Sequence, residues 1–191
     1  ALQGLGLDYD SLKAIKPDII LVTNTAFGTV GPYAKKVGFD SVAQAMSGNM
    51  VMSGSPSQPA KSFGPWVDYG TAGLCAFGTM AAIMHRNATG EGQEVQGALL
   101  ATALMTTNSI MTEEHVTQRG RVPTGNRGQV SAPSDLFATK DGHIYVICAG
   151  QPMYARWASL MGDNHWLAEE RFATDDDRAE NGAEISARMQ I

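Results

Sequence analysis

The residue with the clearest capacity for chemistry is Asp68, which lies in the segment WVDYGTAGL at the start of a long helical pattern. An aspartate carboxylate is ionised at neutral pH, so it can attack an activated acyl group without a base. Aspartate is also favoured as the N-cap of a helix, where its carboxylate accepts hydrogen bonds from backbone amides. The residue type and its position therefore leave two roles open for Asp68, a nucleophile or a helix cap.

The other reactive residues form no recognisable catalytic or metal-binding motif. The four histidines occur at no spacing typical of metal ligands, and the two cysteines, Cys75 and Cys148, are far apart in apolar surroundings. The chain has no G-x-S-x-G and no G-K-[ST] motif, and Tyr9 stands where a dinucleotide-binding loop that begins at Gly4 needs its third glycine. We therefore expect no metal site, no tightly bound cofactor and no disulfide.

Composition excludes several classes of function. The 191 residues include 14 Lys and Arg against 19 Asp and Glu, and the resulting net charge of −5 disfavours binding to nucleic acid. Hydrophobic residues make up 43% and charged residues 17%, so the chain should bury a core. The most apolar run, 71–84, is too short to cross a bilayer of about 30 Å, and no secretory signal opens the chain. These features predict a soluble, cytoplasmic protein that does not bind nucleic acid.

Helices and strands alternate in the part of the chain that must position Asp68. The sequence predicts a helix over 8–15, a buried strand over 19–23 and a helix that starts near Asp40 and ends at Gly48. A loop rich in Ser, Gly and Pro then leads to the helix after Asp68, expected over 69–86. The elements predicted beyond it are a strand over 95–100 and an amphipathic helix closed by Gly120.

Small residues recur along the helix expected over 69–86. They include Gly73 and Gly78, whose lack of side chains allows a neighbouring element to approach the helix backbone closely. We therefore expect this helix to pack tightly at both glycines.

The last third of the chain has a different pattern. A stretch rich in Gly, Pro and Arg over 119–134 indicates a linker or a binding loop, and we place a domain boundary there, dividing the chain into 1–124 and 125–191. Asp141-Gly142 between two apolar segments predicts a hairpin with a type I′ turn. After it, the spacing of four apolar residues predicts one buried helix face, made of Met153, Trp157, Leu160 and Met161.

Five segments carry a family signature by their order and spacing. They are GLDYDSLKAIKPDIILVTNTAFGTVGPYA, GFDSVAQAMSG, WVDYGTAGL, TGEGQEV and APSDLFATKDGHIYV. With them the chain resembles, over almost its whole length, the family III CoA-transferases, typified by formyl-CoA transferase and carnitine CoA-transferase and related to the α-methylacyl-CoA racemases. The resemblance implies an α/β fold with part of a Rossmann-like, CoA-binding large domain, followed by the start of a smaller α+β domain. It also implies an interlocked homodimer.

The resemblance assigns Asp68 the role of covalent nucleophile in the transfer of CoA from an acyl-CoA to a carboxylate. Attack on the thioester gives a mixed anhydride, CoA thiolate converts it to an aspartyl-CoA thioester, and the acceptor carboxylate reverses these steps. Water must be excluded so that the thioester energy is kept. Lys36 and Phe39 fall near family positions that line the CoA site, although a solvated lysine would look the same, and Leu99 matches an apolar wall position that would be core in any case.

A glycine-containing loop matches the family only in part. Gly125, Gly128 and Gln129 align with the loop that shields the nucleophile in formyl-CoA transferase, but its run of four glycines is reduced here to two. An oxalate-type acceptor is therefore not implied, and a plain interdomain turn is an equal alternative. The nearby Arg119, Arg121 and Arg127 could contact CoA phosphates or simply be solvated.

Two alternatives to an active transferase remain. A 2-methylacyl-CoA racemase needs two acid/base groups, and the racemases carry histidine in a GHD motif where this chain has Gly38-Phe39-Asp40. Phe39 cannot transfer a proton, which disfavours that reaction. Since the family's chains are about twice as long, the second alternative is a fragment that is inactive by itself and lacks the segment that binds the CoA nucleotide.

Overall fold

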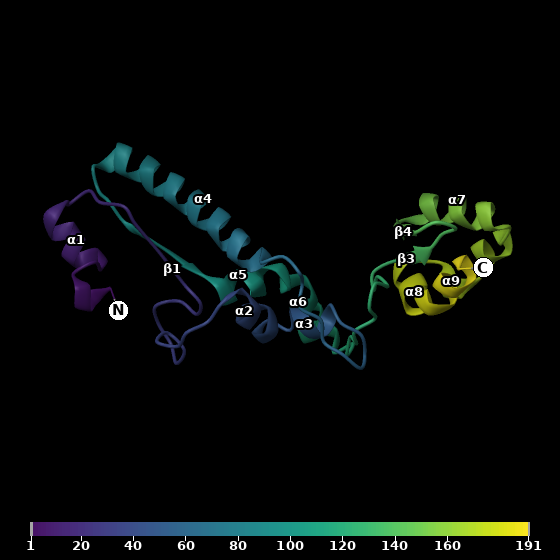
Figure 1. Ribbon diagram of the computed structural model, residues 1–191. Helices are drawn as coiled ribbons and strands as arrows, with labels where there is room; N and C mark the ends of the chain where they lie inside the picture. Colours follow the sequence, from purple (N-terminus) through teal and green to yellow (C-terminus); the bar gives the residue numbers. More distant parts are fainter. Residues whose placement is uncertain (1, 191) are drawn as a thin grey trace. The chain divides into compact units, whose positions relative to one another are not determined.

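The computed structural model describes residues 2–190, which divide into two compact units. The first unit contains the residues up to 52 together with 58–121, and the second contains 53–57 and the residues from 122 onward. The chain therefore contributes a short segment to the second unit before it completes the first. Both units combine helices with a two-stranded sheet, so the chain is a mixed α/β protein (Figure 1).

The first unit contains two parallel strands. β1 (Leu21–Thr25) pairs with β2 (Glu94–Ala98), with Leu21 beside Glu94 and Thr25 beside Ala98. Parallel strands need a long crossover connection, and this one contains three helices. The helices of the unit are η1 (Gln3–Leu5, a 3-10 helix), α1 (Tyr9–Ile15), α2 (Asp40–Met46), α3 (Asn49–Met52), α4 (Trp66–Thr89), α5 (Leu99–Thr106) and α6 (Asn108–Thr117).

The long helix α4 lies alongside β1 and β2 (Figure 1). A β-carbon added at Gly78 would lie 2.8 Å from Cγ1 of Val95 in β2, whereas one added at Gly73 would meet no atom within 4 Å. The expected close packing is therefore confirmed at Gly78. It is wrong at Gly73, because none of the described residues approaches the helix at that point.

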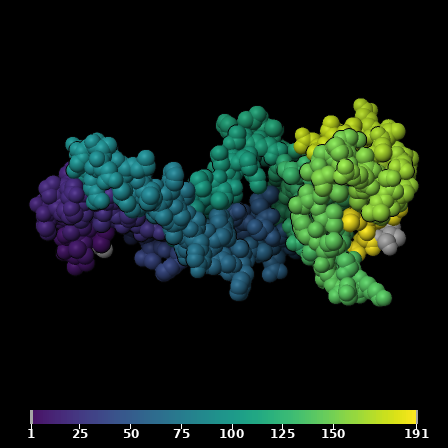
Figure 2. Space-filling view, turned by 90° about the horizontal axis from the view of Figure 1, so that it is seen from above, coloured from purple at the N-terminus to yellow at the C-terminus, as the bar shows by residue number. Residues whose placement is uncertain are grey.

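The outer face of α4 is apolar and open to solvent. Tyr69, Phe77, Met80 and Met84 are each at least 60% exposed, and Figure 2 shows α4, in blue-teal, on the surface of the first unit. The described residues do not cover this face. In the described part of the chain we find no helix with the length and apolar character needed to cross a lipid bilayer.

Local hydrogen bonds explain why some elements of the first unit begin or end at other residues than predicted. β1 begins at Leu21, two residues later than expected, because the Ile19 amide donates to the Lys16 carbonyl in a turn. The helix expected to run to Gly120 is two helices, since the chain breaks at Thr107, whose hydroxyl donates to carbonyls one turn earlier. The predicted loop over 49–65 contains α3.

The second unit is built from an antiparallel hairpin and a group of helices. The last pair of the hairpin is Ala138 with His143, so four residues connect the two strands. Asp141 and Gly142, which lie in this connection, do not adopt positive φ angles. The predicted hairpin is confirmed, but the two-residue type I′ turn is wrong. The elements are β3 (Ser134–Ala138), β4 (His143–Ile147), α7 (Gln151–Met161), η2 (Asn164–Ala168), η3 (Glu170–Phe172), α8 (Asp175–Glu180) and α9 (Gly182–Met189).

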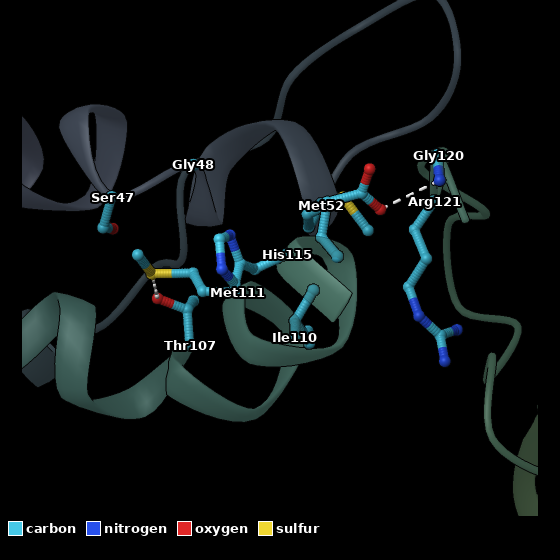
Figure 3. Close-up of a pocket in the computed structure, with 10 residues that line it drawn as sticks. Ser47, Gly48, Met52, Thr107, Ile110, Met111, His115, Gly120 and Arg121 are labelled. Atoms are coloured by element: carbon cyan, nitrogen blue, oxygen red, sulfur yellow. Dashed lines mark hydrogen bonds between the residues drawn. The ribbon is translucent and has the colours of Figure 1, made fainter. Parts of the chain in front are cut away.

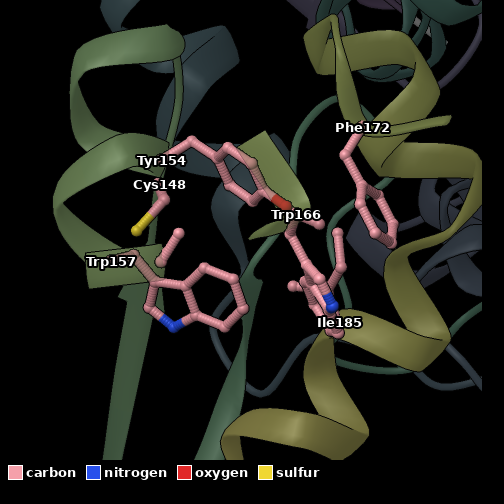
Figure 4. Packing of buried hydrophobic residues seen from close by; sticks show 8 residues of the cluster. Cys148, Tyr154, Trp157, Trp166, Phe172 and Ile185 are labelled. Atoms are coloured by element: carbon pink, nitrogen blue, oxygen red, sulfur yellow. The ribbon is translucent and has the colours of Figure 1, made fainter. Parts of the chain in front are cut away.

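Aromatic residues from several of these elements form the core of the second unit (Figure 4). On α7 the buried side chains are Tyr154 and Trp157, together with Ala158, and not the full predicted set. Leu160 is 84% exposed and Met153 is 46% exposed, so the predicted face is wrong at both. The helix is rotated so that Tyr154 packs against the rings of Trp157 and Phe172.

Candidate active site

Asp68 lies in the first turn of α4, and its side chain is exposed. The helix begins at Trp66 and its N-cap is Pro65, so Asp68 is the third residue of the helix. The interpretation of Asp68 as the helix cap is therefore wrong. Within residues 2–190, the Asp68 carboxylate has no hydrogen-bond or ion-pair partner.

A different carboxylate, that of Asp40, caps α4. Asp40 begins α2 and is only 5% exposed. Its Oδ2 atom accepts hydrogen bonds from the backbone amides of Val67, at 2.8 Å, and Asp68, at 3.2 Å. A negative charge at this end of a helix interacts favourably with the unpaired amides and the helix dipole. The start of α4 is thus fixed by a residue 28 positions earlier in the chain.

The side chain of Gln44 connects Asp40 to the loop before α4. Gln44 lies one turn after Asp40 on α2 and is 1% exposed. Its Nε2 donates to Oδ1 of Asp40, and its Oε1 accepts from the Ser62 amide at 3.1 Å. Both oxygens of the buried Asp40 carboxylate are therefore hydrogen-bonded, as a buried charge requires.

Asp40 and Gln44 are not among the site residues expected from the sequence. The signal that could have revealed them is a polar pair spaced i and i+4 in the segment GFDSVAQAMSG, which places both side chains on one face of a short helix. A polar pair on a face that also carries Ala43 indicates a buried hydrogen-bonded network.

The residues predicted to bind CoA lie in different environments within the first unit. Phe39 directly precedes Asp40 and its ring is largely exposed, with 69% of its surface accessible. The Nζ atom of Lys36 lies 4.6 Å from the centroid of the Tyr33 ring. Leu99 is buried in a cluster with Val67. The structure therefore brings Phe39 close to the Asp68 turn through Asp40, whereas Leu99 supports that turn from the core.

Lys36 also lines a cavity of about 910 Å³ beside the strands. Val95 faces α4, so the alternation of side chains along β2 places Glu94 and Gln96 on the opposite face of the sheet, where this cavity lies. Lys35 and Gly38 contribute to its lining. The cavity therefore reaches the chain segment that leads into Phe39 and Asp40.

A second cavity of about 580 Å³ lies between the end of α2, α3 and α6 (Figure 3). Its lining is largely apolar and includes Met52, Ile110 and Met111. Arg121, considered from the sequence as a ligand of CoA phosphates, lines this cavity, whereas Asp68, Lys36, Phe39 and Leu99 do not. This cavity is therefore separate from the surface that carries Lys36.

Two of the arginines considered as phosphate ligands are engaged by one carboxylate. Arg121 donates to Glu113 from Nε at 2.6 Å and from Nη2 at 2.7 Å, and Arg119 donates to Glu113 at 3.2 Å. The hydrogen bond from Arg121 is the main reason why the pKa of Glu113 lies below its usual value. The positive charge of this pair is thus partly compensated within the first unit.

The predicted glycine loop belongs to the second unit. Gly125 adopts a φ of 66° and its amide donates to the Gly54 carbonyl, while the Gly128 amide donates to Ser134. The side chain of Gln129 donates to the Val122 carbonyl at 2.8 Å. These bonds give the loop a defined shape within its unit, and its role at the nucleophile stays a prediction. Among residues 2–190, no cluster of three or more His, Cys, Asp or Glu could hold a metal ion.

Comparison with known proteins identifies the chain. The model of the family described as CoA-transferase family III matches residues 1–191. The chain belongs to CoA-transferase family III. Among curated relatives, this family III chain is 33% identical over 186 residues to succinyl-CoA–D-citramalate CoA-transferase of Chloroflexus aurantiacus. It is 30% identical over 185 residues to succinate–glutarate CoA-transferase of Agrobacterium fabrum. Each match covers 96% of the chain and 46% of the relative.

Solved structures resemble the family III chain in the same way. A CAIB/BAIF family protein from Brucella suis matches with a TM-score of 0.78 and 30% identity, over 99% of this chain and 50% of that one. Rv3272 from Mycobacterium tuberculosis matches with a TM-score of 0.81 and 26% identity, over the same shares of the two chains. The family III chain therefore spans about half the length of the relatives it matches.

Proposed function

We propose that the full-length enzyme containing these residues transfers CoA from an acyl-CoA thioester to a carboxylate, with Asp68 as the nucleophile. The observation that carries the proposal is the exposed Asp68 carboxylate, which has no partner within residues 2–190, on a helix turn whose amides are bound by Asp40. Membership of CoA-transferase family III supports the reaction class. The relatives named as transferases of CoA to citramalate and between succinate and glutarate support a carboxylate as acceptor.

The proposed reaction exchanges the two acyl groups through the Asp68 carboxyl. A carboxylate oxygen of Asp68 attacks the thioester carbon, the C–S bond breaks and CoA thiolate leaves, which gives a mixed anhydride. The thiolate then attacks the aspartyl carbonyl, forms an aspartyl-CoA thioester and releases the donor as a carboxylate. The acceptor carboxylate attacks this thioester, the C–S bond breaks and CoA thiolate leaves again, which gives a second anhydride. The thiolate then attacks the carbonyl carbon of the acceptor's acyl group, which releases the new acyl-CoA and regenerates the Asp68 carboxylate.

The first unit offers groups that suit CoA beside this nucleophile. Lys35 and Lys36 provide positive charge at the 910 Å³ cavity for phosphate groups. The exposed Phe39 ring, between this cavity and Asp40, provides an apolar contact for the pantetheine arm. We propose that Leu99 acts from the core by supporting Val67. The homodimer implied by the resemblance stays a prediction.

The racemase alternative is not favoured. Phe39 stands at the position where the racemases carry their histidine, and the curated relatives described above are CoA-transferases. Exchange of substrate α-deuterium with solvent distinguishes the two reactions, since transfer of CoA leaves the α-carbon untouched. We expect no exchange.

Trapping of the acylated aspartate tests the proposed function. Trypsin cuts after Lys61 and Arg86, and in the resulting peptide 62–86 Asp68 is the only acidic side chain. We expect incubation of the full-length enzyme with acyl-CoA and hydroxylamine to place a hydroxamate on this peptide. The variant Asp68→Ala should lose both label and turnover, and Asp141→Asn, in the exposed hairpin connection, should keep both. Ordinary turnover by Asp68→Ala would exclude Asp68 as the nucleophile.

A further inference from the structure

The first turn of α4 is arranged in an unusual way for a helix that carries an acid at its third position. Such an acid commonly hydrogen-bonds back to the N-cap amide in a capping box. Here the N-cap is Pro65, which has no N–H, so that partner is missing. The amides of Val67 and Asp68 are bound by Asp40. The N-cap donor is therefore missing, and the Val67 and Asp68 amides are not available to the Asp68 carboxylate.

We propose that Asp40 is a positioning residue for the reaction of Asp68. Its carboxylate fixes the Asp68 backbone and occupies the amides of Val67 and Asp68, so that the Asp68 side chain does not pair with these two amides of its own helix turn. Hydrogen bonds to a carboxylate stabilise its negative charge and make it a poorer nucleophile. The inference rests on the proposed function, because it describes how the nucleophile of that reaction is prepared.

Every hydrogen-bond partner of the two Asp40 carboxylate oxygens is a donor. Both oxygen positions therefore require an acceptor. Oδ2 receives two backbone amides, and Oδ1 receives Nε2 of Gln44, whose Oε1 in turn receives the Ser62 amide. The Asp40→Asn substitution keeps the shape but turns one acceptor into a donor that faces another donor. Adding Gln44→Glu restores every donor–acceptor pair in the same geometry and keeps one carboxylate in the network.

This reversal gives a test that separates positioning from general stability. In the full-length enzyme we would measure the rate at which acyl-CoA labels peptide 62–86, the kcat and KM for acyl-CoA, and the thermal midpoint. For Asp40→Asn we expect labelling rate and kcat to fall about 10-fold or more with KM within about two-fold, as misplacement of a reacting group predicts. The double variant should return to within about three-fold of the wild type, since the two positions are coupled.

Each outcome decides the proposal. If the wild type is labelled on peptide 62–86 and Asp40→Asn is labelled as fast, the inference is wrong and the proposed function stands. If the wild type is not labelled there, the proposed function itself fails. If Asp40→Asn does not fold, the double variant decides: a folded double variant with kcat near that of the wild type supports positioning. A folded double variant that regains the thermal midpoint but not the labelling rate overturns it.

Discussion

Gly78 of α4 lies so close to Val95 of β2 that an added β-carbon would stand 2.8 Å from Cγ1 of the valine. Carbon atoms in packed interiors approach to about 3.5–4.0 Å, so a side chain at position 78 forces the helix and the strand apart. Asp68 is in the first turn of the same helix. The absence of a side chain at Gly78 therefore helps to set the distance between the helix that carries Asp68 and the sheet.

We predict that Gly78→Val lowers the free energy of unfolding by about 1–3 kcal/mol through overpacking. Gly73→Val is the matched control on the same helix, because a β-carbon there meets no atom within 4 Å. Its effect should stay within about 0.5 kcal/mol, as for surface substitutions. Denaturant unfolding of the two variants measures the difference. Equal free energies of unfolding for the two variants would show that α4 is not packed tightly against Val95 at Gly78.

The helices and strands of the first unit could be predicted because their signals are local. Asp8 before the first helix, the glycine after α2 and the apolar run at β1 each act over a few residues, and α1, α2 and β1 occur close to their predicted positions. The exposed Leu160 shows the limit of such signals. Its spacing fits the buried face of α7, but the packing partners, which are rings from η2 and η3, decide which side of the helix is covered.

The arrangement around Asp68 depends on contacts that local patterns cannot reveal. The motif that contains Asp68 pointed to this residue as the nucleophile, and the preference for aspartate at helix starts left a cap as its alternative role. The cap comes instead from Asp40, which is 28 residues away and becomes buried only when α2 packs against α4. Burial of a charged residue is a property of the assembled fold.

The second unit should lose stability in acid through Asp175. The buried Arg178 donates to Asp175 at 2.6 Å, and this hydrogen bond is the main cause that lowers the pKa of Asp175 below its ordinary value of 3.8. A carboxyl whose pKa is lower in the folded state stabilises the fold above its unfolded pKa, and this contribution is lost as the pH falls through the folded pKa.

We therefore expect Asp175→Asn to lower the thermal midpoint of the second unit at pH 7. The fall of this midpoint between pH 7 and about pH 3 should be smaller in the variant than in the wild type. Thermal unfolding followed by the fluorescence of Trp157 and Trp166, which lie in the core of this unit, measures this midpoint. Asp141→Asn serves as the control, since Asp141 is exposed in the hairpin connection. The same acid sensitivity in Asp175→Asn and the wild type would contradict this assignment.

Lys36 provides a test of the proposed CoA site. Because its ammonium group is proposed to contact phosphate and not the reacting atoms, Lys36→Ala should raise the KM for acyl-CoA roughly 3–10-fold and change kcat less than about two-fold. The increase should shrink at high ionic strength, where salt screens an exposed charge. Steady-state kinetics with Lys140→Ala, an exposed lysine of the second unit, gives the reference. An unchanged KM would remove Lys36 from the CoA site.

Transfer of oxygen from the acceptor into Asp68 tests the central claim most directly. In the proposed reaction each turnover releases one Asp68 oxygen with the donor carboxylate and replaces it with one from the acceptor. We would incubate the full-length enzyme with acyl-CoA and an acceptor carboxylate labelled with ¹⁸O, and analyse peptide 62–86, whose only acidic side chain is Asp68. We predict that ¹⁸O appears in this peptide only when both substrates are present. Turnover without ¹⁸O in the peptide would contradict a covalent role for Asp68.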